Sequence, residues 1–338
     1  MKNLKYLVMA FILLISLTLV SCNKDDKKVN SKDNLKEVDL VLDWYPNAVH
    51  SFIYNAIEKD YYKNEGLKVN IKFPSNSSDP LALTGAGKAT LGIYYPQHLI
   101  NAIANEGVPV KSVGAIIQSQ LNVVISLKDQ NINRPKDLEN KTIGSSGDPL
   151  TEAVIKDMIK NDNGDPNGIN LVDIGFDIIS SMSTKRVNAT TGGMVNHEVP
   201  VMINKGFDVN YFYPCDYGVP NSYELVFVAN NNTIDKNPDI IKKFLKASKK
   251  GFDYMKNCPN TSLDLLLNNH QKDNFPLTKE IEEESMNILL PKMENENSKF
   301  LSQSSDVWQQ NIDWLYDKGF IKNKISVDDV FINVETDQ

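Results

Sequence analysis

The sequence has few of the residues that carry the commonest kinds of charged site. Only two of its 36 basic residues are arginines, Arg134 and Arg186, and the formal net charge is −7 at pH 7. A mildly acidic chain without a basic patch is a poor partner for nucleic acid. The four histidines, His50, His98, His197 and His270, show no paired ligand spacing. We therefore expect no nucleic-acid partner, no metal and no cofactor.

Cysteine is also scarce, and the three cysteines are Cys22, Cys215 and Cys258. Cys22 belongs to an N-terminal pattern described in the next paragraph. Cys215 and Cys258 are far apart in the sequence, and two widely spaced cysteines are a weak indication of a disulfide even in an exported protein. A Cys215–Cys258 bond is therefore the less favoured alternative.

Long apolar runs are missing except near the N-terminus. Leu7–Val20 is apolar, follows the charges of Lys2 and Lys5, and leads into Ser21 and Cys22. The run is short for a membrane span and has the order of a secretory signal. Its end resembles a bacterial lipobox, in which the cysteine carries the lipid. We expect residues 1–21 to be a lipoprotein signal peptide and Cys22 to hold the protein on the extracytoplasmic face of the cell membrane. A retained transmembrane anchor is the alternative.

The rest of the chain predicts two α/β lobes. Residues 22–36 are polar and charged, as in a flexible tether. From there to Ile117 strand and helix patterns alternate, which favours a mostly parallel sheet. The apolar pattern stops at Gln118 and restarts at Leu121. Because 338 residues exceed one core of average size, we assign 37–120 to lobe 1, 121–229 to lobe 2 and 230–338 to a helical return that completes lobe 1.

The first candidate site lies where a predicted strand, Val38–Leu42, gives way to an amphipathic helix that starts near Val49. In open α/β sheets, ligands bind beyond the carboxyl ends of the strands. The connecting loop offers a carboxylate, two aromatic rings, an amide and an imidazole, from Asp43, Trp44, Tyr45, Asn47 and His50. These groups suit a flat, nitrogen-rich molecule, although Trp44 and Tyr45 are also candidates for ordinary core packing. Tyr94 and Tyr95 occupy an equivalent position after a later strand, with one of the two expected to face the crevice.

The second candidate site is Asn196 with Glu198, where a strand meets a helix. A carboxylate next to an amide can accept from the amino group and the ring N–H of an aminopyrimidine. The alternative for Glu198 is a solvated glutamate in a first helical turn. A third polar stretch, Ser145–Pro149, could hold an anion at a helix start, but a plain turn is favoured because it lacks the lysine of a phosphate loop.

Several stretches, in this order, resemble the thiamine-precursor branch of extracellular solute-binding proteins, in the NMT1/THI5-like domain family. They are Leu42–Tyr62, Pro109–Ile117, Pro135–Leu138, Gly193–Glu198, Tyr217–Pro220 and Tyr223–Leu225. The resemblance is strongest at Asp43-Trp44-x-Pro46-Asn47-x-x-His50 and at Asn196-x-Glu198. It implies a periplasmic-binding-protein-like type II fold, with two α/β lobes that are joined by a two-strand hinge and close on a ligand.

The same resemblance implies roles for individual residues. Trp44, Asn47 and His50 would line the cleft from the first lobe, and Tyr94 or Tyr95 would add an aromatic face. Asn122 would make a hinge contact, and the second lobe would contribute Asn196, Glu198 and Tyr217. The chain departs from the family near the Asn196–Glu198 turn, where an aromatic residue is usual and this sequence has Met194, Val195 and His197. The second lobe is therefore expected to stack less on the ligand.

The function implied is non-enzymatic. The protein would act as a monomer and deliver a pyrimidine precursor of thiamine to the permease and ATPase of an ABC transporter. Alternatives are another flat heterocycle, such as a riboflavin-like molecule, and a sulfonate-like solute. The latter is disfavoured because neither arginine lies in a cleft motif. A pyrimidine-synthesising enzyme of the same fold is disfavoured by the export signal and by Cys215 standing alone where the enzymes have several cysteines.

Overall fold

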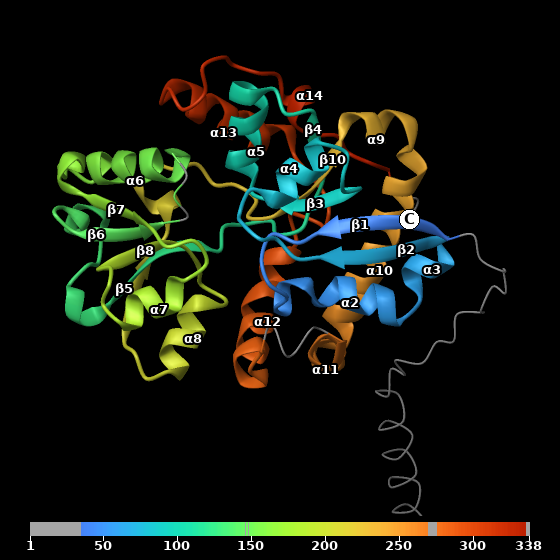
Figure 1. The fold of residues 1–338 in the computed structure, drawn as a ribbon, viewed down its shortest axis with the longest axis horizontal. Helices are drawn as coiled ribbons and strands as arrows, with labels where there is room; N and C mark the ends of the chain where they lie inside the picture. Colours follow the sequence, from blue (N-terminus) through green and yellow to red (C-terminus); the bar gives the residue numbers. More distant parts are fainter. Residues whose placement is uncertain (1–34, 146, 148, 270–275, 336–338) are drawn as a thin grey trace, which may run out of the picture. The chain divides into compact units, whose positions relative to one another are not determined.

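The computed structural model describes residues 35–145, 147, 149–269 and 276–335 (Figure 1). The predicted signal peptide, the expected lipidation site Cys22, nearly all of the predicted tether and His270 lie outside these residues. Among the described residues, none of the helices combines the length and the apolar character that a membrane span requires.

The first sheet has five strands in the order β2-β1-β3-β10-β4. β1, β2 and β3 run parallel, as the alternating pattern predicted, and β10 pairs antiparallel with both β3 and β4. The bounds are β1 Lys36–Val41, β2 Leu67–Lys72, β3 Leu91–Tyr94, β4 Val110–Ala115 and β10 Val226–Asn230.

Helices cover both faces of this sheet, α4, α5, α13 and α14 on one side and α2, α3 and α10 on the other (Figure 1). Pro96 and Gly107 delimit α5 as predicted, since proline suits a first helical turn and Gly107 takes the left-handed conformation (φ 67°) just past the end. The bounds are η1 Ala48–His50, α2 Ser51–Glu58, α3 Tyr61–Asn64, α4 Asp79–Gly85, α5 Pro96–Glu106, α9 Asn231–Lys236, α10 Pro238–Asn257, α11 Pro259–Asn269, α12 Lys279–Met293, α13 Ser305–Asp317 and α14 Val327–Val330.

The second sheet repeats this arrangement, with the order β7-β6-β8-β5-β9. β6 is parallel to β7 and β8, while β5 is antiparallel to β8 and β9. α6 covers one face, and α7 and α8 cover the other (Figure 1). The bounds are β5 Asn122–Leu127, η2 Lys128–Gln130, η3 Pro135–Leu138, β6 Thr142–Ser145, α6 Pro149–Asn161, η4 Pro166–Gly168, β7 Asn170–Asp173, α7 Ile178–Ser183, β8 Ala189–Met194, α8 Glu198–Asn204, β9 Val209–Phe212 and η5 Pro214–Tyr217.

The chain crosses between the sheets at residues 118–121 and again at 221–225. The two crossing segments run side by side, since the Glu224 N–H donates to the carbonyl of Ile117 (3.1 Å) and the Ile116 N–H to that of Leu225 (2.8 Å). The strand after each crossing, β5 or β10, enters its new sheet antiparallel. This is the architecture of periplasmic binding proteins that the resemblance implied, with two α/β lobes and a two-segment hinge.

The second crossing corrects one domain boundary. The sequence assigned residues up to 229 to the second lobe, but β10 pairs with strands of the first sheet from Val226 onward. Its buried, uninterrupted apolar run fits a central strand of either sheet, so the pattern alone did not reveal the partner strands.

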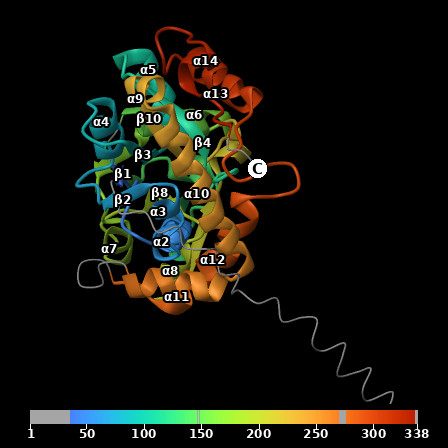
Figure 2. The same cartoon turned by 90° about the vertical axis from the view of Figure 1, so that its right-hand side faces the viewer.

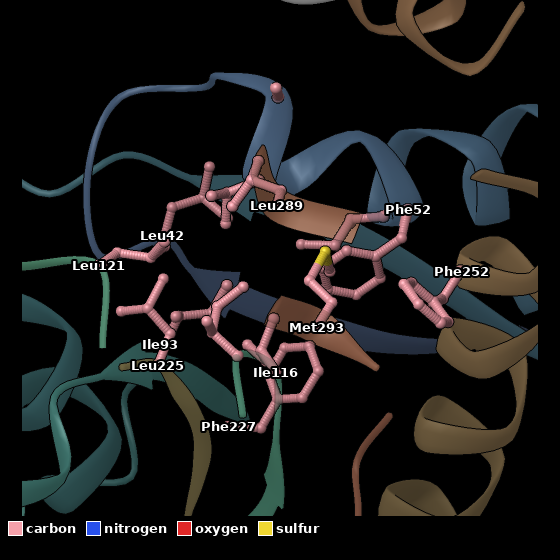
Figure 3. Packing of buried hydrophobic residues seen from close by; sticks show 14 of the residues in the cluster. Leu42, Phe52, Ile93, Ile116, Leu121, Leu225, Phe227, Phe252, Leu289 and Met293 are labelled. Carbon is pink, nitrogen blue, oxygen red and sulfur yellow. The ribbon is translucent and has the colours of Figure 1, made fainter. Parts of the chain in front are cut away.

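The main core lies under the first sheet and extends to the crossing segments (Figure 3). Fully buried in it are Leu42 just after β1, Ile93 from β3, Phe52 from α2, and Leu121 and Leu225 from the crossings. The crossing segments are therefore held by apolar packing as well as by hydrogen bonds.

α12 lies against both lobes, because it packs on η1 of the first and on α8 of the second (Figure 2). Its carboxyl end also reaches the first crossing, where the Lys292 ammonium donates to the carbonyl of Gln120 (3.0 Å) and the Gln118 N–H to that of Lys292 (2.7 Å). Elsewhere, Cys215 is a free thiol, so the Cys215–Cys258 disulfide is not formed.

Candidate functional site

The loop after β1 is held in shape by its own polar groups. Asn47 caps η1, because its side-chain oxygen accepts from the Val49 N–H (3.0 Å) while its own N–H donates to Nδ1 of His50 (3.2 Å). That leaves the proton of the neutral His50 ring on Nε2, from which it donates to Asp43 Oδ1 (3.0 Å). His50 is fully buried and stabilises the loop through these two hydrogen bonds. Contrary to the expectation from the resemblance, it does not line the cleft.

A pocket opens between the two lobes at this loop. Five of the residues singled out from the sequence line it: Asp43, Trp44 and Asn47 from the loop, Tyr95 just after β3, and Glu198 from the start of α8. The other lining residues are Val49, Gly192, Met194, His197 and Leu225. Residues about 150 positions apart in the chain thus meet at the carboxyl ends of strands from both sheets, where open α/β sheets bind ligands.

An aromatic residue that the sequence analysis missed faces Trp44 from the second lobe. The ring centroids of Phe176 and Trp44 are 4.1 Å apart at an interplanar angle of 73°. The ring centroid of Tyr45 lies 5.4 Å from that of Phe176. Phe176 follows β7 in the same way that Trp44 follows β1, after the left-handed Gly175 (φ 49°). That position beyond a strand's carboxyl end is the signal that could have identified it. Phe176 supplies the second-lobe aromatic ring that Met194 and His197 do not.

Acidic groups and one histidine occupy the floor of the pocket. Glu198 Oε1 lies 2.8 Å from Nδ1 of His197, and Glu198 Oε2 accepts from the Met194 N–H (2.7 Å). On the other side, Glu282 of α12 approaches His197 (3.8 Å) and accepts from the N–H of Ala48 (2.7 Å). His197 therefore lies between a carboxylate of the second lobe and one that is bonded to the first.

The charges in this cluster follow from burial and pairing. Burial alone would lower the pKa of His197, but Glu198 and Glu282 outweigh it and raise that pKa to about 9. Burial would raise the pKa of Glu198, yet the facing His197 and the Met194 N–H hold it below its usual value. At neutral pH the pocket therefore presents an imidazolium next to an ionised carboxylate. Burial raises the pKa of Glu282, which His197 partly offsets.

The two neighbouring tyrosines face different surroundings, Tyr94 as the last residue of β3 and Tyr95 as the residue after it. Tyr95 reaches the pocket, and its hydroxyl points at Asp43 Oδ2 (3.4 Å). Burial, and next the charge of Asp43, raise the pKa of Tyr95 well above the usual value, so this hydroxyl stays protonated. Tyr94 is only 7% exposed and packs into the core between the sheet and α5. Of the pair, Tyr95 is the one that faces the crevice.

The remaining expected residues lie around the pocket rather than in it. Asn196 is 1% exposed and donates to the Ser285 hydroxyl of α12 (3.0 Å), so it ties α8 to that helix. Tyr217 packs its ring on Phe212 (5.5 Å) in the core of the second lobe. Asn122, at the first crossing, lines a neighbouring pocket on the hinge side. In the described part of the chain, no three His, Cys, Asp or Glu side chains are arranged to hold a metal ion.

Comparison of the sequence with known proteins identifies the family of this chain. The profile of the family described as NMT1/THI5 like matches residues 47–262. The chain is 38% identical to a formylaminopyrimidine-binding protein of Halalkalibacterium halodurans, over 96% of this chain and 97% of the relative. It is also 27% identical to the 4-amino-5-hydroxymethyl-2-methylpyrimidine phosphate synthase THI11 of Saccharomyces cerevisiae, over 65% of this chain and 67% of the relative.

Among solved structures, the alkanesulfonate-binding protein SsuA of Xanthomonas axonopodis pv. citri, bound to MOPS, superposes with a TM-score of 0.69. The match covers 90% of this chain and 100% of that protein, at 10% sequence identity. The likeness agrees with the fold described above, and at this identity it carries no information on the ligand.

Proposed function

The chain belongs to the NMT1/THI5-like family, and from that premise we propose that it is the solute-binding protein of an ABC importer and captures a pyrimidine precursor of thiamine. The observation that carries the proposal is the pocket between the lobes, which the Trp44 ring and the Glu198 carboxylate line together and where Phe176 of the second lobe packs against Trp44. A planar, neutral heterocycle with amino groups fits this combination of groups.

Each group has a distinct part in the recognition that we propose. The Trp44 ring stacks on one face of the pyrimidine, and Phe176 packs edge-on against Trp44 and holds that ring in position. The ionised Glu198 accepts hydrogen bonds from the amino edge, since each of its oxygens has a lone pair left after bonding His197 or Met194. Asp43, which is held by His50, accepts from a second edge of the ring.

The charge of the pocket supports a pyrimidine over an anionic solute. Asp43 and Glu198 line it beside the single imidazolium of His197, and none of its described lining residues is a lysine or an arginine. A sulfonate would meet carboxylates without a compensating guanidinium or ammonium group. The sulfonate alternative is therefore not retained, despite the shared fold.

A binding role is also favoured over an enzymatic one. The relative named as a binding protein matches almost the whole chain at 38% identity, whereas the yeast synthase matches 65% of the chain at 27%. We accordingly propose that the pyrimidine leaves the site unchanged and passes to a permease that is powered by an ATPase.

Lipid anchoring through Cys22 is part of the same proposal, because it would keep the binding protein at the membrane in which its permease lies. Metabolic labelling with radioactive palmitate tests it. The wild-type protein should take up label and sediment with membranes, and Cys22→Ala should do neither. Label that persists in the variant would rule out Cys22 as the lipidated residue.

Calorimetric titration with a panel of small molecules tests the ligand assignment. Aminopyrimidines with formylaminomethyl or hydroxymethyl groups should bind, whereas riboflavin and an alkanesulfonate should not. Binding of riboflavin or the sulfonate in place of the pyrimidines would refute the proposal. The protein should be purified by denaturation and refolding before titration, so that ligand carried over from the cell does not mask binding.

A further inference from the structure

A second pocket lies beside the first, on the side of the crossing segments. It is lined by α6 of the second lobe, by the start of α5 of the first, and by Gln120, Asn122 and Glu224 of the crossings. Tyr95 lines both pockets, and the consecutive residues Glu224 and Leu225 line one pocket each. The two pockets therefore adjoin at the Tyr95 side chain.

Two acceptor oxygens of the second pocket lack a donor. Glu224 is 5% exposed, and its Oε2 accepts from the N–H groups of Leu121 and Asn122 (2.8 Å for Asn122), but no described residue donates to its Oε1. Gln120 Oε1 is buried and likewise has no donor in the described part of the chain, while its Nε2 donates to the Pro220 carbonyl (3.2 Å). Buried acceptors in native proteins normally meet a donor, so the buried Gln120 Oε1 indicates a missing partner, and Glu224 Oε1 in the same pocket keeps its capacity to accept.

The charge around the pocket limits what that partner can be. No lysine or arginine is among its described lining residues. The charge of the Lys292 ammonium group acts on Glu224, but this group donates its hydrogen bond to the backbone carbonyl of Gln120. A group bearing N–H or O–H satisfies such acceptors, whereas a phosphate offers further acceptors and negative charge without a cation to meet them.

We infer that this hinge-side pocket is a second compartment of the ligand cleft, in which Gln120 and Glu224 accept hydrogen bonds from an N–H or O–H on the ring's substituent. The inference rests on the proposed function, because it takes the pyrimidine ring to lie at Trp44 and Glu198. It narrows the ligand class to unphosphorylated pyrimidines whose side arm carries a hydrogen-bond donor. It also gives the crossing segments a direct part in selecting the ligand.

Three ligands with the same pyrimidine ring and different substituents measure how much the substituent contributes to the binding free energy. They are 4-amino-5-hydroxymethyl-2-methylpyrimidine, its 5-methyl analogue, which lacks only the hydroxyl group, and its phosphate ester. By calorimetry the wild-type protein should bind the hydroxymethyl compound about tenfold more tightly than the methyl analogue, as one hydrogen bond would give. The phosphate ester should bind more weakly than either.

Two variants assign that preference to the pocket. Gln120→Met keeps the length of the side chain but removes the acceptor, so the preference for the hydroxymethyl compound should fall to about twofold or less. Affinity for the methyl analogue should not change. Glu224→Gln keeps an oxygen for the Leu121 and Asn122 N–H groups and should lower the same preference. Gln309→Met is the matched control, because Gln309 bonds Asp313 on α13 and lines neither pocket.

The outcomes distinguish this inference from the function on which it rests. If the wild type binds the hydroxymethyl and methyl compounds equally, or if Gln120→Met keeps the full preference, the second compartment is refuted and the pyrimidine site stands. If none of the three probes binds the wild-type protein, the proposed function fails and the inference fails with it. Thermal melts of each variant establish that it is folded, and Gln120→Met decides the question should Glu224→Gln not fold.

Discussion

At the scale of the residue, the way each acidic group is partnered decides what it can do. Asp43 is oriented by His50, Glu198 by His197 and the Met194 N–H, and Glu224 by two backbone N–H groups. Each carboxylate keeps acceptor capacity toward a pocket while its orientation is fixed. Such preorganisation lowers the cost of binding, because these side chains have no freedom left to lose.

Glu198→Gln should weaken binding of the pyrimidine, because a neutral amide cannot accept two hydrogen bonds from the amino edge with the strength of a carboxylate. The loss of a charge-assisted interaction is expected to cost about 1.5–3 kcal/mol. Calorimetry measures it directly, with Glu284→Gln as the control because Glu284 is exposed on α12 and lines neither pocket. Equal affinities of Glu198→Gln and the wild type would remove Glu198 from the recognition scheme.

Phe176→Leu should weaken binding of the pyrimidine by about 0.5–1.5 kcal/mol. This is the typical contribution of an aromatic pair beyond the apolar area that it buries. The leucine keeps apolar cover over Trp44 but lacks the ring. Tyr211→Leu is a suitable control, since Tyr211 is 45% exposed on β9 of the same lobe. Titration of both variants gives the comparison, and an effect in Tyr211→Leu as large as in Phe176→Leu would point to a general loss of structure instead.

The His197 cluster predicts a dependence of stability on pH. The folded pKa of His197, about 9, lies above the ordinary histidine value of 6.5. The stabilisation from protonated His197 is therefore fully present below about pH 6.5 and is lost as the pH rises through about 9. Urea unfolding of the wild type and of His197→Gln between these pH values should show the wild-type advantage shrinking as the pH rises. A constant difference across the range would contradict the assignment of charge to His197.

At the scale of the element, the segment after Val49 forms two helices, α2 and α3. The sequence analysis expected an amphipathic helix from about Val49, but α2 ends at Glu58 and a separate helix, α3, begins at Tyr61, with Asp60 left-handed between them (φ 56°). The break lets Tyr62 turn under α10, where its hydroxyl lies 2.8 Å from that of Ser248 and its ring stacks on Phe244. Burial of the whole ring outweighs the helix interruption.

The contact between α2 and α10 depends on a glycine. A Cβ at Gly251 would lie 2.1 Å from the backbone oxygen of Phe52, and neither helix backbone can yield cheaply. Gly251→Ala should therefore lower the free energy of unfolding by about 1–3 kcal/mol or more, although alanine is the better helix former. Urea denaturation measures the change, with Lys250→Ala as the exposed neighbour control. An unchanged midpoint would mean that the helices separate without cost.

At the scale of the whole described structure, the two lobes meet at the Trp44–Phe176 contact, at the His197 cluster and at the crossing segments. A ligand that is bound by both lobes stabilises the closed arrangement by its differential affinity for it. At a concentration one hundred times its Kd, the pyrimidine should raise the free energy of unfolding by roughly 2.7 kcal/mol. Urea unfolding with and without ligand tests this. Glu198→Gln should show a smaller rise at the same ligand concentration, and the absence of a rise in the wild type would contradict binding to the folded protein.

Much of this architecture was accessible from the sequence. Short stretches of sequence predict the alternation of strands and helices, the limits of α5 at Pro96 and Gly107, and the break in the apolar pattern at Gln118. The same is true of the Asp43–His50 loop, whose candidate residues lie next to a strand end that periodicity identifies. Local backbone preferences determine such features, and they need no knowledge of distant partners.

The tertiary structure alone decided which distant groups meet. Segments far apart in the chain come together where Phe176 packs on Trp44, where Glu282 approaches His197 and where β10 joins the first sheet. The same holds for the hinge-side pocket, in which Gln120 and Glu224 lie together. His50 is a brace rather than a lining residue for the same reason, since its fully buried position follows from the packing around it. The sequence by itself determined where strands end and helices begin. Packing across the two crossings determined which side chains face the pockets, because burial and pairing depend on neighbours that no local pattern specifies.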